Sequence, residues 1–535
     1  MKRLISNFIL LLVIGLLFAQ CANRGTPSGG EKDITPPVIT KSIPENYSTN
    51  FSATEIRIYF DEYIKINDLQ KQLIISPPME PEPSITPQGS ASKYITIKIT
   101  DTLLPNTTYA FNFGESIVDN NESNPYPFYR YVFSTGALID SLEINGRVDD
   151  ALNQKPDEFV SVMLYEIDST FTDSIIYNKK PKYITNTLDS TSTFKLSNLK
   201  AGRYFLVALK DENSNYTFQQ KKDKIGFKKN FITLPTDSSF IIKMFKETNN
   251  FKATRPKLVS GNKIAFGYEG DAEEMKIDIL SDSPQGFENK IIKDSKSDSL
   301  YYFFKPDIKS DSLVFKITNT NYNDTLVVRT RALIKDSLVV SAASELNLAL
   351  NNDFMMTANI PLSTFDETKV SIMDKDSTII NFTSSFETRS NTYTLKFNKE
   401  ESNSYKIKML PGALKDFFGT ETDTLDFNVR TRALADYGNL RITLQNADYP
   451  SIVQLITPNG EVKAETYVTK PEPIDFIYIT AGKYLVRIIY DANNNKVFDT
   501  GNYLKKIQPE RVTNFTIEEI RSGWDNIETL NLNKK

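Results

Sequence analysis

From Pro36 to its end, this 535-residue chain carries hydrophobic residues at every second position in short segments, and this pattern restricts its fold most. Segments 56–60, 95–99 and 109–113 show the alternation most clearly. A period of two places successive side chains on opposite faces of a β-strand, one face buried and one exposed. Clusters of Asn, Asp, Ser, Pro and Gly separate the segments, and no convincing amphipathic helix interrupts them. The sequence therefore predicts an all-β protein.

The length of the chain is incompatible with a single hydrophobic core. A chain of 535 residues is expected to form several domains of roughly 80–120 residues each. Charged residues make up 24% of the chain and the formal net charge is −4, so neither sign is in large excess. This balance argues against a nucleic-acid partner and against an acidic solvating tail.

Two residue types are nearly or wholly missing. The chain has no histidine and a single cysteine. Without histidine it cannot build a Ser-His-Asp or Cys-His catalytic centre, an imidazole-ligated zinc site or a histidine general base. A lone cysteine excludes an internal disulfide bond. The composition thus favours a protein that is not an enzyme and that is stabilised by packing.

The amino terminus has the features of a secretion signal. Lys2 and Arg3 precede an uncharged apolar stretch over 8–18, which is shorter than the about 20 residues that span a bilayer. Leu17–Gln20 then leads directly into Cys21, the only cysteine. This arrangement resembles the lipobox of bacterial lipoproteins, although Phe18 and Gln20 stand where small residues are usual.

The lipoprotein resemblance implies a signal peptide over 1–20 and lipid, such as palmitate, on Cys21. Residues 21–35 are rich in Gly, Ser, Pro and Thr and suit a flexible tether. Acyl chains contribute about 0.8 kcal/mol per buried CH₂, so several chains would hold the protein on a membrane. We expect an outer-membrane or cell-surface location. The alternative is a signal peptide cut elsewhere, with Cys21 incidental.

A set of short motifs marks the first domain. In chain order they are Pro36–Val38, Ile43–Pro44, Ile58–Tyr63, Leu104–Tyr109, Ile117–Asp119 and Phe133–Gly136. Their order and spacing resemble the bacterial Ig-like domain of surface-layer (SbsA) type. The resemblance implies a β-sandwich in which Tyr109 is a corner tyrosine, its hydroxyl tied to nearby backbone. Segment 403–432 repeats the order of tyrosine, acidic turn and final strand, and 324–331 suggests a further Ig-like unit.

A sharper internal repeat has an offset of 280 residues. Ala201–Val207, followed by Asp211, aligns without a gap with Ala481–Arg487, followed by Asp491. Together with segments 146–150 and 160–165, the first copy resembles the transthyretin-like fold found beside carboxypeptidases. The resemblance implies small sandwiches that serve as spacers and interaction surfaces.

The predicted organisation is a string of Ig-like and transthyretin-like β-sandwiches behind a lipoprotein signal peptide. After the tether, the expected domains are Ig-like over 36–138, transthyretin-like over 140–247, Ig-like over 250–333 and 336–433, and transthyretin-like over 436–535. Regular repetition of small modules is expected of a stalk or scaffold.

Two Asp-x-Asn-x-Asn loops follow the repeated strands and are the best candidates for a metal site. Their oxygen ligands would be Asp491, Asn493, Asn495 and Asp499 in the second loop, and Asp211, Asn213 and Asn215 in the first. Side-chain oxygens at alternate positions of a tight loop can converge on Ca²⁺. The alternative is an Asx-rich connection in which these side chains bind their own backbone.

Two further groups of residues allow a functional and a structural interpretation. The carboxylates of 61–62 and 119–122 could be imagined as a glycosidase pair, but they fit strand ends and turns better. In the aromatic run 125–131, Tyr126 and Phe128 could bind a sugar or protein, with Tyr126 expected to be the more exposed. Otherwise Tyr129 and its successors form the inner face of a strand. Trp524 is expected in the core of the last domain.

We therefore expect a non-enzymatic cell-envelope lipoprotein that acts as scaffold, spacer or accessory subunit for protein partners. The alternative is a glycan-binding surface lipoprotein, and a carboxylate-dependent glycosidase is the weakest hypothesis. The expected partners are the membrane, through the lipid, and envelope proteins, with glycans as the alternative ligand.

Overall fold

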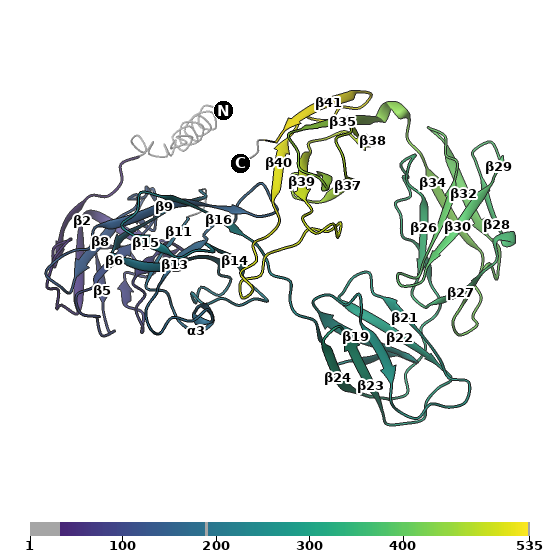
Figure 1. Ribbon diagram of the computed structural model, residues 1–535, viewed down its shortest axis with the longest axis horizontal. Helices are drawn as coiled ribbons and strands as arrows, with labels where there is room; N and C mark the ends of the chain where they lie inside the picture. Colours follow the sequence, from purple (N-terminus) through teal and green to yellow (C-terminus); the bar gives the residue numbers. More distant parts are fainter. Residues whose placement is uncertain (1–32, 188–190, 533–535) are drawn as a thin grey trace, which may run out of the picture. The chain divides into compact units, whose positions relative to one another are not determined.

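The computed structural model describes residues 33–187 and 191–532 (Figure 1). The expected signal peptide, Cys21 and residues 21–32 of the tether lie outside the described residues. The described chain is nearly all β, which confirms the predicted fold class, a string of β-sandwiches. Its helices are the single turns α2 (Leu69–Gln72) and α3 (Ile175–Asn178), with 3₁₀ turns η1 (Glu367–Lys369) and η2 (Leu434–Asp436). None of the described helices is long and apolar enough to cross a membrane.

The chain forms two compact units. Of the described residues, the first contains 33–143 together with 182–187 and 196–201, and the second contains the others. The first unit is built on a sheet in the order β1 (Ile39–Ile43), β2 (Glu55–Ile66), β5 (Ser92–Lys98), β4 (Ser84–Thr86), with β7 (Ile117–Asp119) also paired to β2. A second sheet has the order β3 (Ile74–Ser76), β6 (Thr108–Asn112), β8 (Arg130–Ser134). The residues of β11 (Tyr183–Asn186) are grouped with this compact unit, although this strand is not part of either sheet.

The core of the first unit follows the period-two pattern of its strands. Ile56, Ile58 and Phe60 of β2 point inward and are buried in one cluster with Phe111 of β6 and Phe133 of β8. The intervening residues of β2 face outward and are more exposed. Burial on one face only is what alternation predicts for a strand of a sandwich.

A tyrosine corner ties the first unit together and recurs in the second unit. The Tyr109 hydroxyl accepts a hydrogen bond from the Leu104 backbone N–H at 2.9 Å, which confirms its predicted role. In the later copy, the Tyr405 hydroxyl accepts from the Glu400 N–H at 2.6 Å. Both tyrosines lie five residues after the backbone group that they bind.

A threonine at the end of the final strand completes the corner. The N–H groups of Thr135, Thr330 and Thr431 donate to backbone carbonyls of 107, 311 and 403, at 3.1, 3.0 and 3.0 Å. The middle copy keeps this bond but has buried Leu313 where the other two have tyrosine. The shared device supports the proposed relation between the three Ig-like units.

Removing either corner hydroxyl should destabilise its sandwich measurably. We expect Tyr109→Phe and Tyr405→Phe each to lower the free energy of unfolding by about 1 kcal/mol, because one backbone N–H loses its acceptor. Calorimetry of the full chain would measure the change. Tyr63→Phe is the matched control, since Tyr63 is an exposed tyrosine of β2. An equal loss in the control would contradict the corner's role.

Two sandwiches of the chain have matching topology. In one, the sheet β12 (Thr193–Leu199), β9 (Leu142–Asp150), β16 (Ser239–Met244) faces strands β10 (Ser161–Glu166), β13 (Gly202–Lys210), β14 (Lys224–Phe227) and β15 (Ile232–Leu234). In the other, the sheet β38 (Ile474–Thr480), β35 (Tyr437–Gln445), β41 (Asp525–Asn531) faces β37 (Val462–Val468), β36 (Ser451–Ile456), β39 (Leu485–Tyr490), β40 (Val512–Thr516). The first and last strands of each pair in parallel, β9 with β16 and β35 with β41. We call them the second and the last sandwich.

Two further sandwiches lie between these in the chain (Figure 1). The earlier contains β17 (Lys252–Ala253), β18 (Lys257–Ser260), β19 (Lys263–Glu269), β22 (Ser299–Lys305) and β21 (Glu288–Lys293), with β20 (Lys276–Ile279), β23 (Ser312–Asn319) and β24 (Tyr322–Arg329). The later has one sheet in the order β25 (Val340–Ala342), β26 (Phe354–Ala358), β31 (Thr392–Phe397), β30 (Phe382–Glu387). A second sheet has the order β29 (Ile379–Ile380), β28 (Val370–Met373), β32 (Ser404–Met409), β34 (Leu425–Arg430). A separate pair is formed by β27 (Leu362–Phe365) and β33 (Leu414–Asp416). Phe303 of the earlier and Phe417 of the later share an apolar cluster.

The only tryptophan does not occupy a core. Trp524 is 59% exposed in the turn before β41, and the Arg521 guanidinium lies 5.5 Å from its ring centroid. The expectation that Trp524 fills the last core was wrong. Ile520, four residues earlier, is fully buried there instead.

Candidate functional site

The two Asx loops have equivalent hydrogen bonds at the offset of 280. Asp211 accepts the Tyr216 N–H at 2.6 Å, and Asp491 accepts the Lys496 N–H at 2.9 Å. Tyr216 and Lys496 both have positive φ, 59° and 66°, so the chain turns in the same way in each loop. Asp491 also accepts a bond from the Tyr467 hydroxyl at 2.9 Å. The loops are thus structural repeats as well as sequence repeats.

The remaining Asx side chains also bind within the loops. Asn493 and Asn495 donate their amide nitrogens to the same carboxylate oxygen of Asp499, at 2.6 and 2.9 Å. In the first loop Asn213 donates to Gln219, and Asn215 accepts the Thr217 N–H at 2.9 Å. Nowhere in the described chain do three or more carboxylate, thiol or imidazole residues form a group able to hold a metal ion. Asx turns account for this geometry.

Calcium is therefore not expected to stabilise the protein through these loops. The Asp491 carboxylate is already engaged by backbone N–H groups and a tyrosine hydroxyl. The melting temperature of the full chain in about 5 mM CaCl₂, roughly 5,000 times a dissociation constant of about 1 μM, should equal that in MgCl₂ at the same concentration. A calcium-specific rise that Asp491→Asn abolishes would restore the metal interpretation.

Two of the carboxylates that could form a glycosidase pair, Asp61 and Asp119, have structural partners. Asp119 is buried and accepts hydrogen bonds from four backbone N–H groups, those of residues 121, 122, 123 and 124. Asp61 accepts the Val38 N–H at 2.8 Å and thereby fastens β1 to β2. Burial raises the pKa of Glu62, and the neighbouring carboxylates, Asp119 first, raise it further. Asp119 and Asp61 thus have the turn and strand roles expected of them.

The aromatic run of the first unit divides differently from the prediction. Tyr129, Tyr131 and Phe133 are buried in the core, as the core-packing interpretation expects. Tyr126 is half-buried and meets the Tyr129 ring edge-on at 5.8 Å, whereas Phe128 is 51% exposed. The expectation that Tyr126 is the more exposed was wrong. Phe128 has φ of 54°, and this left-handed conformation turns its side chain away from the core.

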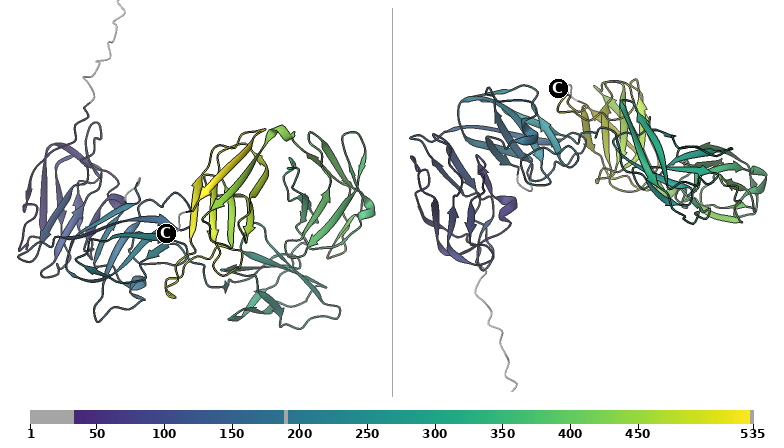
Figure 2. Two further views of the ribbon diagram at one scale, coloured as in Figure 1. Left: turned by 45° about the horizontal axis from the view of Figure 1, so that its top comes forward. Right: turned by 90° about the horizontal axis from the view of Figure 1, so that it is seen from below.

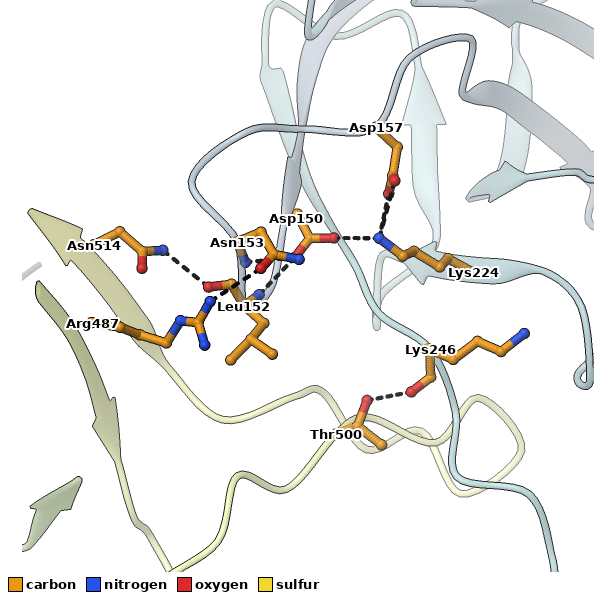
Figure 3. A network of polar contacts seen from close by, with 9 residues as sticks. All are labelled: Asp150, Leu152, Asn153, Asp157, Lys224, Lys246, Arg487, Thr500 and Asn514. Atoms are coloured by element: carbon orange, nitrogen blue, oxygen red, sulfur yellow. Dashed lines mark hydrogen bonds and ion pairs between the residues drawn. The ribbon is translucent and has the colours of Figure 1, made fainter. Parts of the chain in front are cut away.

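A network of polar contacts joins the second and the last sandwich (Figure 3). The Arg487 guanidinium donates to the Asn153 side chain at 3.1 Å, and Asn514 donates to the Leu152 carbonyl at 3.0 Å. Arg487 and Asn514 are cross-strand neighbours on β39 and β40. The outer face of the last sandwich thus meets the loop after β9.

That loop is held in place by a lysine between two carboxylates. The Lys224 ammonium lies 2.7 Å from Asp150 and 2.9 Å from Asp157 (Figure 3). Burial lowers the pKa of Lys224, but its hydrogen bonds to Asp150 and Asp157 outweigh that effect and raise the pKa overall. A charged lysine bonded to both ends of the loop fixes the surface that Arg487 contacts.

A loop of the last sandwich, residues 491–511, inserts a tyrosine into the second sandwich. Tyr503 is fully buried, with ring centroids of Phe205 and Phe227 at 5.9 and 5.4 Å. Its hydroxyl donates to the Asp173 carbonyl at 2.7 Å, and its backbone N–H donates to Glu247. A buried aromatic ring with a bonded hydroxyl is the usual form of an interface anchor.

Neighbouring residues of the loop strengthen this anchor. The Lys506 ammonium lies 4.1 Å from the Tyr503 ring centroid and 2.7 Å from the Asp173 carboxylate. Gly501 packs against the Phe245 ring so closely that a Cβ would come within 2.5 Å of it. The Thr500 hydroxyl donates to the Lys246 carbonyl at 2.7 Å. The loop therefore contacts its partner along residues 500–506.

This docking was not predicted, because a string of modules was expected to contact only sequence neighbours. The last sandwich instead contacts the second, more than 200 residues earlier in the chain. One signal was present in the repeat: at the offset of 280, Arg487 stands where the other copy has the buried Val207. A charge inside an otherwise apolar strand indicates a partner outside the sandwich.

Comparisons with known proteins identify a family for the first unit only. No curated protein matches the chain at a significant level. One similar solved structure is surface layer protein SbsC, domains 1 to 6, with 11% identity, 88% of this chain and 67% of that chain covered, and a TM-score of 0.14. A titin I-band fragment also has 11% identity, with 52% of this chain and 98% of that chain covered and a TM-score of 0.12. The Bacillus anthracis TIE protein is another (9%, 94% and 76%, 0.14), and with such scores these likenesses support no conclusion about this chain. Residues 33–135 match the family model of the bacterial Ig-like domain, which identifies the domain of the first unit.

Proposed function

We propose that this protein is a non-enzymatic lipoprotein of the cell envelope that acts as a scaffold, spacer or accessory subunit for protein partners. The observation that carries the proposal is the docking of the last sandwich on the second by Tyr503. Docked modules present their surfaces in a fixed arrangement, which is what a scaffold requires. The bacterial Ig-like domain at 33–135 supports an envelope or surface location.

The lipid anchor is tested at its single candidate residue. In the producing cells, wild-type protein should fractionate with membranes and incorporate labelled palmitate. Cys21→Ser should abolish both, since no other thiol is present to carry lipid. If the Cys21→Ser protein still fractionated with membranes and still incorporated palmitate as the wild type does, the lipid anchor at Cys21 would be refuted.

The scaffold role is tested by crosslinking in intact cells. Photoreactive residues at Phe128 and Trp524, both more than half exposed, sample the first unit and the last sandwich. We expect a stoichiometric envelope protein among the adducts of at least one position. The Cys21→Ser chain with the same photoreactive residues is the control for capture away from the membrane. Recovery of no specific adduct would count against the proposal.

An aromatic surface of the first unit favours glycan binding as a second candidate. Tyr59 of β2 and Tyr94 of β5 are opposite each other across the strands, with ring centroids at 5.7 Å. Tyr63 is 56% exposed on the same face, and cations of Lys41, Arg57 and Lys93 lie over the three rings. Aromatic rings beside cations suit acidic sugars.

The glycan hypothesis is tested with purified protein on an array that includes acidic polysaccharides. Binding should fall in Tyr63→Ala and Tyr94→Ala. Tyr126→Ala should leave it unchanged, because the Tyr126 ring packs against Tyr129. Binding that none of these substitutions alters, or an array without signal, would remove this candidate.

A further inference from the structure

Arg487 is an unusually placed charge. Only 3% of the residue is exposed. A guanidinium has five N–H donors, and this one makes two hydrogen bonds, to Gln454 and to Asn153, both at 3.1 Å. Its Nε has no acceptor. Both acceptors are neutral amide oxygens, so nothing in these bonds compensates the charge.

The nearest carboxylate belongs to another group. Asp150 favours the charged form of Arg487 from a distance, but burial has the larger effect and lowers the pKa of Arg487. Asp150 itself is bonded to the Lys224 ammonium and to the backbone N–H groups of Leu152 and Asn153. Within residues 33–187 and 191–532, no carboxylate lies at ion-pair distance from Arg487. Buried charges are normally paired, so this arrangement leaves a position for a negative group.

Arg487 lines a cleft of about 730 Å³ between the second and the last sandwich. The other cations on the cleft wall are Lys155 and Lys210. Both acidic residues of the wall are already paired with lysines, Asp157 with Lys224 and Glu158 with Lys155. Lys210 donates to the Glu158 carbonyl and not to a carboxylate. The wall therefore presents Arg487 and Lys210 as positive groups without carboxylate partners.

A glycine of the cleft wall lies beside the guanidinium. Gly460 also lines the cleft, and a Cβ at this position would lie 3.7 Å from the Arg487 Nη2 and 3.2 Å from the Asn153 Oδ1. Its φ of 87° belongs to the left-handed region that glycine tolerates best. The turn at Gly460 therefore lies next to the Nη2 nitrogen, which donates to Asn153 (Figure 3).

We propose that this cleft is a binding site for an oxyanion, a carboxylate or phosphate group, with Arg487 as its principal ligand and Lys210 as a second cation. The planar guanidinium fork matches the two oxygens of such a group. The site lies across the docked sandwiches, so a bound oxyanion also favours the docked state. This inference goes beyond the scaffold role and does not depend on the lipid anchor.

The test uses the full chain and defined anions. Melting temperature is measured against increasing inorganic phosphate, acetate or glucuronate, with NaCl at the same ionic strength as reference. We expect a saturable rise for at least one oxyanion and none for chloride. A rise in melting temperature with phosphate alone, or with acetate or glucuronate alone, would identify whether the site takes a phosphate or a carboxylate group. A response no larger than that to NaCl would mean that water alone satisfies the guanidinium, and would overturn the proposal.

Variants then assign the response to the cleft. Arg487→Met should weaken the apparent affinity at least about tenfold, because the paired hydrogen bonds are lost. Arg441→Met is the matched control, since Arg441 lies in the same sandwich and is paired with Asp475 on the surface. The Lys155→Met/Lys210→Met pair should weaken binding about threefold through lost charge, even if Arg487→Met misfolds. Unchanged affinity in the lysine double variant, or in folded Arg487→Met, would overturn the assignment.

Discussion

Tyr503→Ala is expected to release the last sandwich from the second while both remain folded. The ring is fully buried between Phe205 and Phe227, and its hydroxyl bonds to the Asp173 carbonyl at 2.7 Å. Truncating a buried aromatic residue to alanine typically costs about 3–5 kcal/mol. Because the ring belongs to one sandwich and its pocket to another, the cost falls on docking and not on either core.

Hydrogen exchange of loop 491–511 and of β14 would measure the release. A loss of about 3 kcal/mol corresponds to opening that is about 100 times more frequent. Tyr503→Phe is the control, because it keeps the ring and removes only the bond to Asp173, at a cost of about 1 kcal/mol. Exchange in Tyr503→Ala as slow as in the wild type would show that docking does not depend on this residue.

Asp119→Ala is expected to have the largest effect on the first unit. The buried carboxylate accepts four backbone N–H groups at 2.7–3.1 Å and so shapes the turn after β7. Hydrogen bonds to charged groups contribute about 1.5–3 kcal/mol each, and water replaces part of them in the variant. We expect a loss of about 3 kcal/mol in denaturant unfolding. Asp119→Asn, which keeps an acceptor oxygen, should lose less, and an equal loss would contradict this explanation.

Because of the same carboxylate, the stability of the first unit is expected to fall at acidic pH. Burial alone would raise the pKa of Asp119, but the backbone N–H donors outweigh burial and lower it below its ordinary value of 3.8. A lowered pKa contributes stability that is complete above the unfolded-state value and is lost as the pH falls through the folded-state value. The stability difference between wild type and Asp119→Ala should therefore shrink below about pH 4. A difference independent of pH would exclude this linkage.

Sequence reasoning succeeded where the structure depends on neighbouring residues. The corner at Tyr109 involves a backbone group only five residues away, so a short motif contains both partners. The Asx loops at Asp211 and Asp491 likewise bind their own backbone. In both loops the aspartate accepts the N–H five residues later, so the offset of 280 reproduces this bond. Alternation along β2 was sufficient to assign its buried face.

Sequence reasoning failed where the environment of a side chain is set by distant residues or by one backbone angle. The pocket for Tyr503 is formed by residues about 300 positions earlier, and no local pattern around Tyr503 distinguishes an anchor from an ordinary loop tyrosine. Trp524 is hydrophobic but sits in a turn, where composition alone cannot indicate exposure. Phe128 is more exposed than Tyr126, the reverse of the prediction, because Phe128 has a positive φ.

The parallel pairing of first and last strands has a mechanical consequence. Residues 145–150 run alongside 239–244 in the second sandwich, and 439–445 run alongside 525–531 in the last. Tension applied between the two ends of such a sandwich pulls these neighbours past each other lengthwise, so it loads their hydrogen bonds together. An antiparallel terminal pair would open one bond at a time under the same load. These two sandwiches are built to bear a pull along the chain.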